Sequence, residues 1–153
     1  MRAMSPAIRL ARIAAGALTL LTACGSLMEM PPSSPDGPRI SNLTFDPPES
    51  VAGCIVTMHL QFDAGDAEIT GGRVRWWVAQ GRGTTSDGTT TLDPELFQGK
   101  ASGEVTVAFR LRKVGRYRYL VQIEDNAGRR SNVLKQDLIS TVAWAPGVIP
   151  CSR

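Results

Sequence analysis

The fold class is decided by the stretch Glu104-Val105-Thr106-Val107-Ala108-Phe109-Arg110-Leu111-Arg112. Its larger apolar side chains occupy every second position, and the positions between them are mostly polar. A period of two places alternate side chains on opposite faces of a β-strand. The stretch therefore predicts a strand with one buried face and one solvated face.

The same period recurs at residues 40–45, 54–62, 73–79 and 117–123. Residues 133–142 also favour a strand, but their pattern does not fix which face is buried. Gly, Pro and Asp between these segments favour turns, and only residues 93–97 favour a single helical turn. The sequence predicts an all-β protein, an antiparallel sandwich. A further strand around residues 89–92 would bring the count to about seven.

Alternation also predicts which side chains form the core. The positions expected to face inward are Cys54, Val56, Met58, Leu60, Phe62, Val74, Trp76, Val78, Val105, Val107, Phe109, Leu111, Tyr117, Tyr119, Val121 and Ile123. His59, the only histidine, falls on the opposite parity of its strand and is expected at the surface.

Three features resemble bacterial immunoglobulin-like domains. Gly115-Arg116-Tyr117 resembles the tyrosine corner of that family, and Trp76 lies where the family often keeps a core tryptophan. Asp125-Asn126-Ala127-Gly128 resembles the hairpin that precedes the last strand. The resemblance covers about residues 39–144 and implies an immunoglobulin-like sandwich. One departure is Tyr119, which stands where antibody domains carry an inter-sheet cysteine.

The N-terminal residues have the pattern of an export signal. Arg2, Arg9 and Arg12 precede an apolar run at residues 13–23, whose last three residues lead into Cys24 as Leu21-Thr22-Ala23-Cys24. This resembles the lipobox of bacterial lipoproteins, with an ordinary secretory signal or a buried helix as the alternatives. The resemblance implies a signal peptide at 1–23 and a lipidated, membrane-anchored Cys24. Gly25, in place of a retaining aspartate, implies the outer membrane of the bacterial cell envelope.

Residues 24–38 are Pro-rich and polar, and we expect a lipidated N-terminus followed by a flexible tether, with the folded domain at 39–153. Three of the 17 basic residues precede Cys24, which leaves 14 basic and 14 acidic residues from Cys24 onward. This balance offers no support for nucleic-acid binding, which requires concentrated basic charge.

Two cysteines remain once Cys24 is assigned to lipid. Cys54 and Cys151 lie 97 positions apart, and an exported protein occupies an oxidising compartment. We therefore expect a disulfide between them, the alternatives being two free thiols or a redox role, for which no Cys-x-x-Cys motif is present. The expectation requires Cα atoms within about 7 Å of each other.

The sequence shows no Ser-His-Asp grouping, no histidine metal motif and no phosphate-binding glycine loop. We therefore expect no enzymatic activity and no cofactor. Asp63, Asp66 and Asp125 are the candidate calcium ligands, and Glu68 and Asn126 lie beside them. The alternative is ordinary turn chemistry, because Asp and Asn side chains stabilise turns.

Trp77 cannot face the core together with Trp76. The outward parity groups it with Arg73 and Arg75, and on a neighbouring strand with Arg118 and Leu120. Exposed tryptophan among arginines is typical of a binding hot spot. There are two alternatives to a binding role for Trp77: residues 80–100 cover its ring, or an arginine of the same sheet stacks on it. We expect a non-enzymatic module that binds an envelope protein or glycan, or, alternatively, a structural or accessory subunit of an envelope complex.

Overall fold

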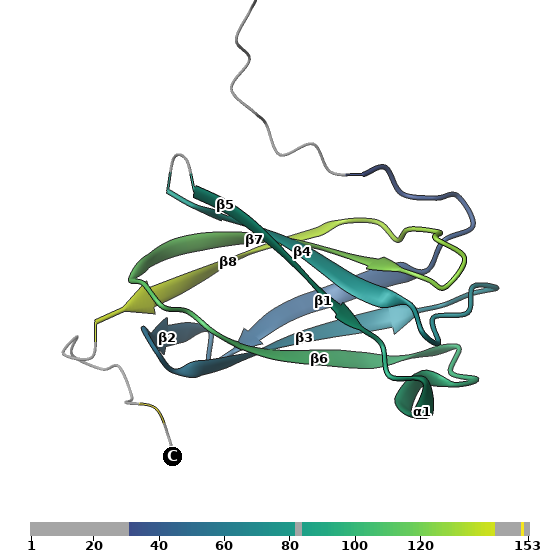
Figure 1. Cartoon of the computed structure of the whole chain (residues 1–153), viewed down its shortest axis with the longest axis horizontal. Coiled ribbons are helices and arrows are strands. Elements are labelled where there is room, and N and C mark those ends of the chain that lie inside the picture. The colour runs from purple at the N-terminus through teal and green to yellow at the C-terminus, as the bar shows by residue number, and fades with distance from the viewer. Residues whose placement is uncertain (1–30, 82–83, 143–150, 152–153) are drawn as a thin grey trace, which may run out of the picture.

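The computed structural model describes residues 31–81, 84–142 and 151 (Figure 1). It contains eight strands and one short helix. In chain order they are β1 (Arg39–Asp46), β2 (Glu49–Val51), β3 (Ile55–Asp63), β4 (Arg73–Gln80), β5 (Thr84–Thr91), α1 (Pro94–Phe97), β6 (Ser102–Arg110), β7 (Gly115–Glu124) and β8 (Leu134–Thr141). Every strand expected from the sequence is present, and β2 is an addition.

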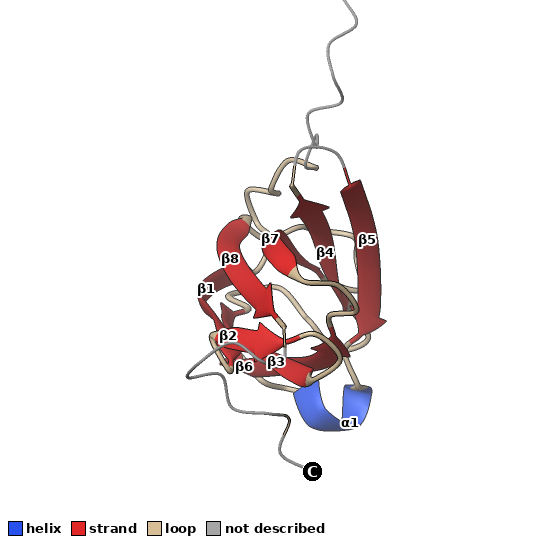
Figure 2. Ribbon diagram, turned by 90° about the vertical axis from the view of Figure 1, so that its left-hand side faces the viewer, coloured by secondary structure: helices blue, strands red, loops and turns tan. Residues whose placement is uncertain are grey.

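The strands form two packed sheets (Figure 2). One sheet has the order β1-β3-β6 and the other β2-β8-β7-β4-β5. All pairs are antiparallel except the short parallel pair of β2 with β8. The chain crosses between the sheets after β1, β2, β3, β5 and β6, and the resulting two-layer arrangement is that of an immunoglobulin-like sandwich. The predicted fold class is confirmed, with eight strands in place of about seven.

The core lies between the sheets and follows the predicted parity. Met58 and Leu60 from β3 and Val121 and Ile123 from β7 are at most 1 % exposed. Trp76 packs against this core and its ring covers Gly88 of β5. Val107 and Phe109 face inward but remain partly exposed, because β6 is one of the two edge strands of its sheet.

The tyrosine corner is confirmed. The buried Tyr117 hydroxyl donates a 2.6 Å hydrogen bond to the carbonyl oxygen of Lys113, four residues earlier. Gly115, between them in the chain, has a φ of 143°, which favours glycine because it carries no Cβ. The bond fixes the direction in which the chain enters β7.

The N-terminal segment is attached to the domain earlier than residue 39. Ser34 donates its backbone N–H to the Arg130 carbonyl (2.8 Å), and its hydroxyl accepts the Arg130 N–H (3.0 Å). The Gln122 amide donates to the Pro31 carbonyl (3.2 Å), and Pro38 is buried. We call residues 31–38 the clasp. This described part of the expected tether is fastened to the sandwich, because its backbone groups find partners on β7 and the β7–β8 hairpin. Cys24 and residues 1–30 lie outside the described residues.

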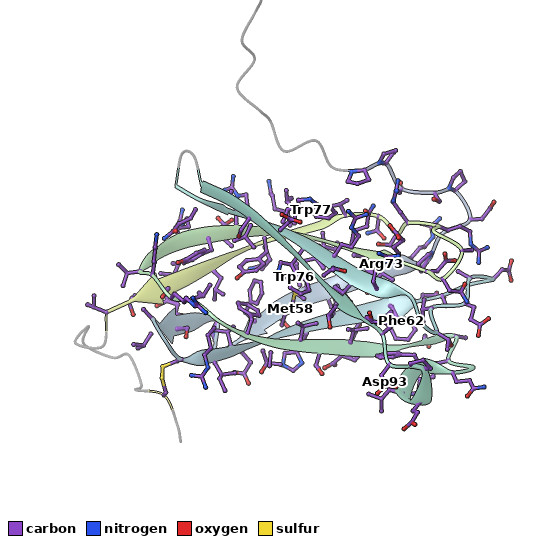
Figure 3. All side chains as sticks on the ribbon, in the orientation of Figure 1. Met58, Phe62, Arg73, Trp76, Trp77 and Asp93 are labelled. Atoms are coloured by element: carbon purple, nitrogen blue, oxygen red, sulfur yellow. A yellow bond between two sulfur atoms is a disulfide. The ribbon has the colours of Figure 1, made fainter. Side chains whose placement is uncertain are left out.

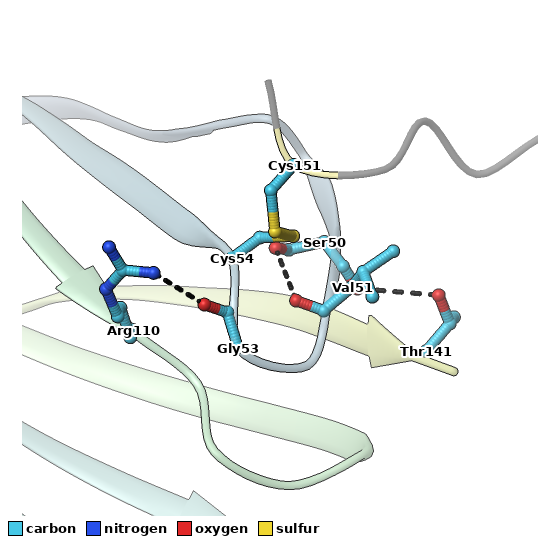
Figure 4. The surroundings of a disulfide bond; sticks show 7 residues. All are labelled: Ser50, Val51, Gly53, Cys54, Arg110, Thr141 and Cys151. Atoms are coloured by element: carbon cyan, nitrogen blue, oxygen red, sulfur yellow. Dashed lines mark hydrogen bonds between the residues drawn. A yellow bond between two sulfur atoms is a disulfide. The ribbon is translucent and has the colours of Figure 1, made fainter. Parts of the chain in front are cut away.

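The expected disulfide joins Cys54 and Cys151, with their Cα atoms 5.2 Å apart (Figure 4). Cys54 is buried in the turn between β2 and β3, whereas Cys151 is exposed. The turn is held by a hydrogen bond from the Gly53 N–H to the Leu111 carbonyl and by one from the Arg110 guanidinium to the Gly53 carbonyl. The bridge therefore ties the C-terminal segment to a fixed point of the sandwich.

Candidate functional site

The outer face of the five-stranded sheet carries the residues that the sequence singled out. Strand register aligns Asp87 of β5, Trp77 of β4, Leu120 of β7 and Lys135 of β8 in one row across the sheet. Arg73 and Arg75 lie on one side of this row along β4, and Arg118 lies on the other side along β7. The structure thus brings all five predicted partner-binding residues onto one surface, which we call the Trp77 face.

Alternation along β4 separates the two tryptophans. Trp76 points between the sheets toward Met58, and Trp77 points away from the core (Figure 3). Trp77 and its cross-strand neighbour Leu120 are both half-buried. They form an apolar pair at the centre of a face whose other side chains are mostly polar or charged, with Ala79 and Ile139 as the exceptions.

Both alternatives for Trp77 can be compared with the structure. The Arg75 guanidinium lies over the Trp77 ring, 5.2 Å from its centroid, so arginine stacking within the sheet does occur. Strand β5, which belongs to the segment at residues 80–100, pairs beside β4 through its backbone and does not lie over the ring. The ring is therefore held in place by Arg75 and keeps part of its surface accessible.

Glu124 organises the arginines at one end of the Trp77 face. Its carboxylate lies 3.3 Å from Arg73 Nε, 3.1 Å from Arg75 Nη1 and 3.4 Å from Arg130 Nε. Burial favours the neutral acid, but hydrogen bonds from Arg75 and Arg130 and the charge of Arg73 hold the pKa of Glu124 below its ordinary value. The glutamate therefore remains ionised and fixes Arg75 above Trp77.

A second ion pair fixes the other end. The Arg118 guanidinium donates to both carboxylate oxygens of Asp137, at 2.9 Å and 3.3 Å. These hydrogen bonds lower the pKa of Asp137 and raise the pKa of Arg118. Both groups are exposed at the surface, so the pair orients side chains and adds little to stability.

The Trp77 face keeps a surplus of positive charge. Its outward cations are Arg73, Arg75, Arg116, Arg118 and Lys135, and its outward acids are Glu49, Asp87, Glu124 and Asp137. An apolar centre with oriented guanidinium groups around it suits a partner that presents an apolar or aromatic group next to carboxylates. The role of Glu124 could not be predicted from the sequence, since its outward parity gives no sign of its burial.

The candidate calcium ligands are engaged in turns. Asp63 accepts the Gly65 N–H (2.9 Å). The Asp125 carboxylate is fully buried and accepts the N–H groups of Ala127 and Arg129 and the Arg129 side chain. Asp66 is exposed, and no group of three or more acidic, histidine or cysteine ligands gathers in the part of the chain that is described. The turn alternative accounts for the bonds that Asp63 and Asp125 make.

His59 lies on the opposite sheet from the Trp77 face. Its Nδ1 is 2.7 Å from Glu104 Oε1, on the solvated side of β3 and β6.

The described helix α1 has four residues, and no helix among the described ranges is long and apolar enough to cross a bilayer.

No family model matches the sequence, and no curated protein does either. Several solved structures are similar in fold. A PKD domain of an M14-like peptidase from a Thermoplasmatales archaeon is 12 % identical (TM-score 0.39, 68 % of this chain, 92 % of that chain). The PmoD soluble domain from Methylocystis is 10 % identical (0.36, 68 % and 89 %). The alkylpurine DNA glycosylase AlkC of Pseudomonas fluorescens is 14 % identical (0.44, 67 % and 30 %). At these values the similarities add nothing on function, and the fold assignment stands on strand order and register.

Proposed function

We propose that the chain is a lipid-anchored protein of the bacterial envelope whose sandwich is a non-enzymatic module that binds another macromolecule. The observation that carries the proposal is the half-buried Trp77–Leu120 pair on the Trp77 face, surrounded by guanidinium groups that Glu124 and Asp137 hold in place. Tryptophan and arginine are the residue types that contribute most at protein interfaces.

Preorganisation supports this reading. A free arginine loses side-chain entropy when a partner fixes it, which weakens binding. On the Trp77 face, Arg75 is already held by Glu124 and by the Trp77 ring, and Arg118 is held by Asp137. The face is therefore partly ordered before any partner arrives.

The clasp shortens the reach of the proposed anchor. Because Pro31 is bonded to Gln122, only seven residue steps separate the clasp from Cys24, at most about 25 Å when fully extended. Gln122 lies two residues from Leu120 on the same face of β7. The proposed partner is accordingly one that meets the Trp77 face close to the membrane surface, in the outer membrane or against it.

The test is capture from detergent-solubilised envelopes with the lipidated protein as bait. Trp77→Ser should weaken partner capture about thirtyfold, the effect of losing a hot-spot residue worth about 2 kcal/mol. Ile55→Ser is the matched control, because Ile55 is 52 % exposed on the other sheet. Equal capture by all three proteins would reject the Trp77 face as the binding surface.

The anchor has its own test. Cys24→Ser should abolish incorporation of labelled fatty acid and move the protein from the membrane fraction to the soluble fraction. Retention of both the label and the membrane association by this variant would reject lipidation at Cys24, whatever the result with Trp77.

A further inference from the structure

Strand β6 has one unpaired edge. It pairs with β3 from Ser102 opposite Asp63 to Arg110 opposite Ile55, without a register shift. On its other side no strand follows within the described residues. A free edge of this length exposes a row of N–H and C=O groups, which favours pairing with another strand.

The other edge strands differ from β6 in ways that discourage pairing. Strand β1 has a register shift between Ser41 and Thr44, with Asn42 at a φ of 51°, and β2 has three residues. Strand β5, Thr84–Thr91, contains no apolar side chain, so a partner strand would bury little apolar surface there. Strand β6 has no bulge, no proline and no lysine.

The side chains on the core-facing side of β6 are also incompletely buried. Val107 and Phe109 face the core, yet both remain partly exposed at this edge. Helix α1 closes only one end of this side, where Phe97 packs against Phe62 with ring centroids 5.9 Å apart. A groove of about 430 Å³ runs along residues 104–108, and its far side is lined by α1 and by residues 90–93 at the end of β5. A strand added beside β6 would cover the exposed parts of both side chains.

The sequence of β6 is complementary to itself. In an antiparallel pair of two identical strands centred on Val107, Glu104 lies opposite the partner's Arg110, and Val105 lies opposite the partner's Phe109. The pairing contains two such ion pairs by symmetry, which Glu104 would make beside its contact with His59 and Arg110 beside its hydrogen bond to the Gly53 carbonyl. In a register shifted by one residue, the core-facing apolar side chains of one strand would lie opposite the solvent-facing polar side chains of the other. In a register centred on Thr106 the faces would match, but Glu104 would no longer lie opposite Arg110 and both ion pairs would be lost.

We propose that β6 pairs with β6 of a second copy of this chain, antiparallel and about a twofold axis at Val107. The two three-stranded sheets then become one continuous six-stranded sheet, and both free edges are satisfied. The argument uses only β6 and its surroundings, so it is independent of the partner proposed for the Trp77 face.

The first test uses charge reversal in the chain from residue 24 onward with Cys24→Ser, which retains every described residue. Sedimentation equilibrium should show a monomer–dimer equilibrium. Glu104→Arg and Arg110→Glu should each raise the dimer dissociation constant at least tenfold, because each turns two attractive contacts into repulsive ones. An equimolar mixture of the two variants, and the double variant, should restore the dimer. Glu68→Arg, in an exposed loop, is the control.

Restoration on mixing also excludes misfolding as the cause, since two misfolded variants would not recover a dimer together. A protein that stays monomeric up to about 1 mM, well above the range of ordinary specific association, would overturn the proposal. So would a dimer that neither charge reversal weakens.

The second test locates the axis. Under oxidation Val107→Cys should cross-link to the same residue of the partner, because directly opposed residues lie within disulfide range. Ala108→Cys should not, because residue 108 lies one position from the axis in each copy and the two cysteines would be too far apart for a disulfide. Cross-linking of Ala108→Cys in place of Val107→Cys, or of neither, would overturn this register.

Discussion

Removing the disulfide should reduce the stability of the domain more than any other single change considered. Cys54 and Cys151 are separated by 97 positions, so the bridge closes nearly the whole described domain into one loop. Chain entropy assigns about 4.7 kcal/mol at 25 °C to a loop of about 100 residues. Because small domains are stable by about 5–15 kcal/mol, loss of this bond should remove a third or more of the total.

Cys151→Ser is the appropriate variant. Cys151 is exposed, so the substitution breaks the bond without removing a side chain from the core, whereas Cys54 is 5 % exposed. Urea unfolding followed by tryptophan fluorescence should show a loss of about 4–5 kcal/mol in the free energy of unfolding. For a domain of about 120 residues this corresponds to a fall in Tm of about 15–20 °C.

The same reasoning predicts a larger m-value for Cys151→Ser, because the unfolded chain expands when the loop is opened. The control is the native protein unfolded in the presence of a reductant, which should match the variant. A loss below about 1 kcal/mol with an unchanged m-value would refute the reasoning, since the bridge would then constrain the unfolded chain very little.

Three further predictions concern single side chains. Tyr117→Phe should cost about 1 kcal/mol of unfolding free energy by removing the corner hydrogen bond, whereas Tyr119→Phe, whose hydroxyl bonds to no described residue, should cost less; equal losses would contradict the corner's role. Gly88→Ala should cost about 1–3 kcal/mol, because the new Cβ would overlap the Trp76 ring, and Ser86→Ala on the same strand is the control for thermal unfolding. Glu124→Gln should cost about 1 kcal/mol at pH 7. Because the pKa of Glu124 is lowered on folding, its contribution is present above the ordinary carboxyl pKa and is lost as pH falls through the lowered value, so the two unfolding curves should converge in acid; a difference independent of pH would contradict this.

Most of the sandwich could be predicted because its strands are half-buried. Each long strand has one face on the core and one in water, so a period of two is visible in the sequence, and Met58, Leu60 and Val121 were placed inward correctly. The tyrosine corner was visible for a local reason, since its donor and acceptor lie four residues apart.

The elements that were missed or only partly predicted carry no such pattern. Strand β2 has three residues, too few to show a period, and it is defined by its parallel pairing with β8, 90 positions later. Strand β5 begins earlier than the four residues expected around 89–92. Its sequence has no alternating apolar residues that would show this, because its contact with the core is made by the Trp76 ring packing over Gly88.

The sequence predicted which residues lie on the Trp77 face, but not which of them are buried or how they are held in place. Parity alone placed Trp77, Arg75 and Leu120 on one surface, and the strand register agrees. The burial of Gln122 and Glu124 on that same surface was not visible, because the groups that cover Gln122 come from the clasp, 91 positions away, and from the β7–β8 hairpin. Contacts of this range depend on the fold and leave no local periodicity.

The proposed binding face, anchor and edge pairing are compatible in one molecule. The Trp77 face belongs to the five-stranded sheet and β6 to the three-stranded sheet, so pairing along β6 leaves the Trp77 face free. Lipidation at Cys24 would hold the clasp of every copy within about 25 Å of the membrane, the reach of the seven residue steps between Cys24 and Pro31. Confinement raises the effective concentration of one β6 edge around another, as linking two binding modules does. An edge pairing that is weak in solution can therefore be well populated on the membrane, and the dimer would hold two Trp77 faces there.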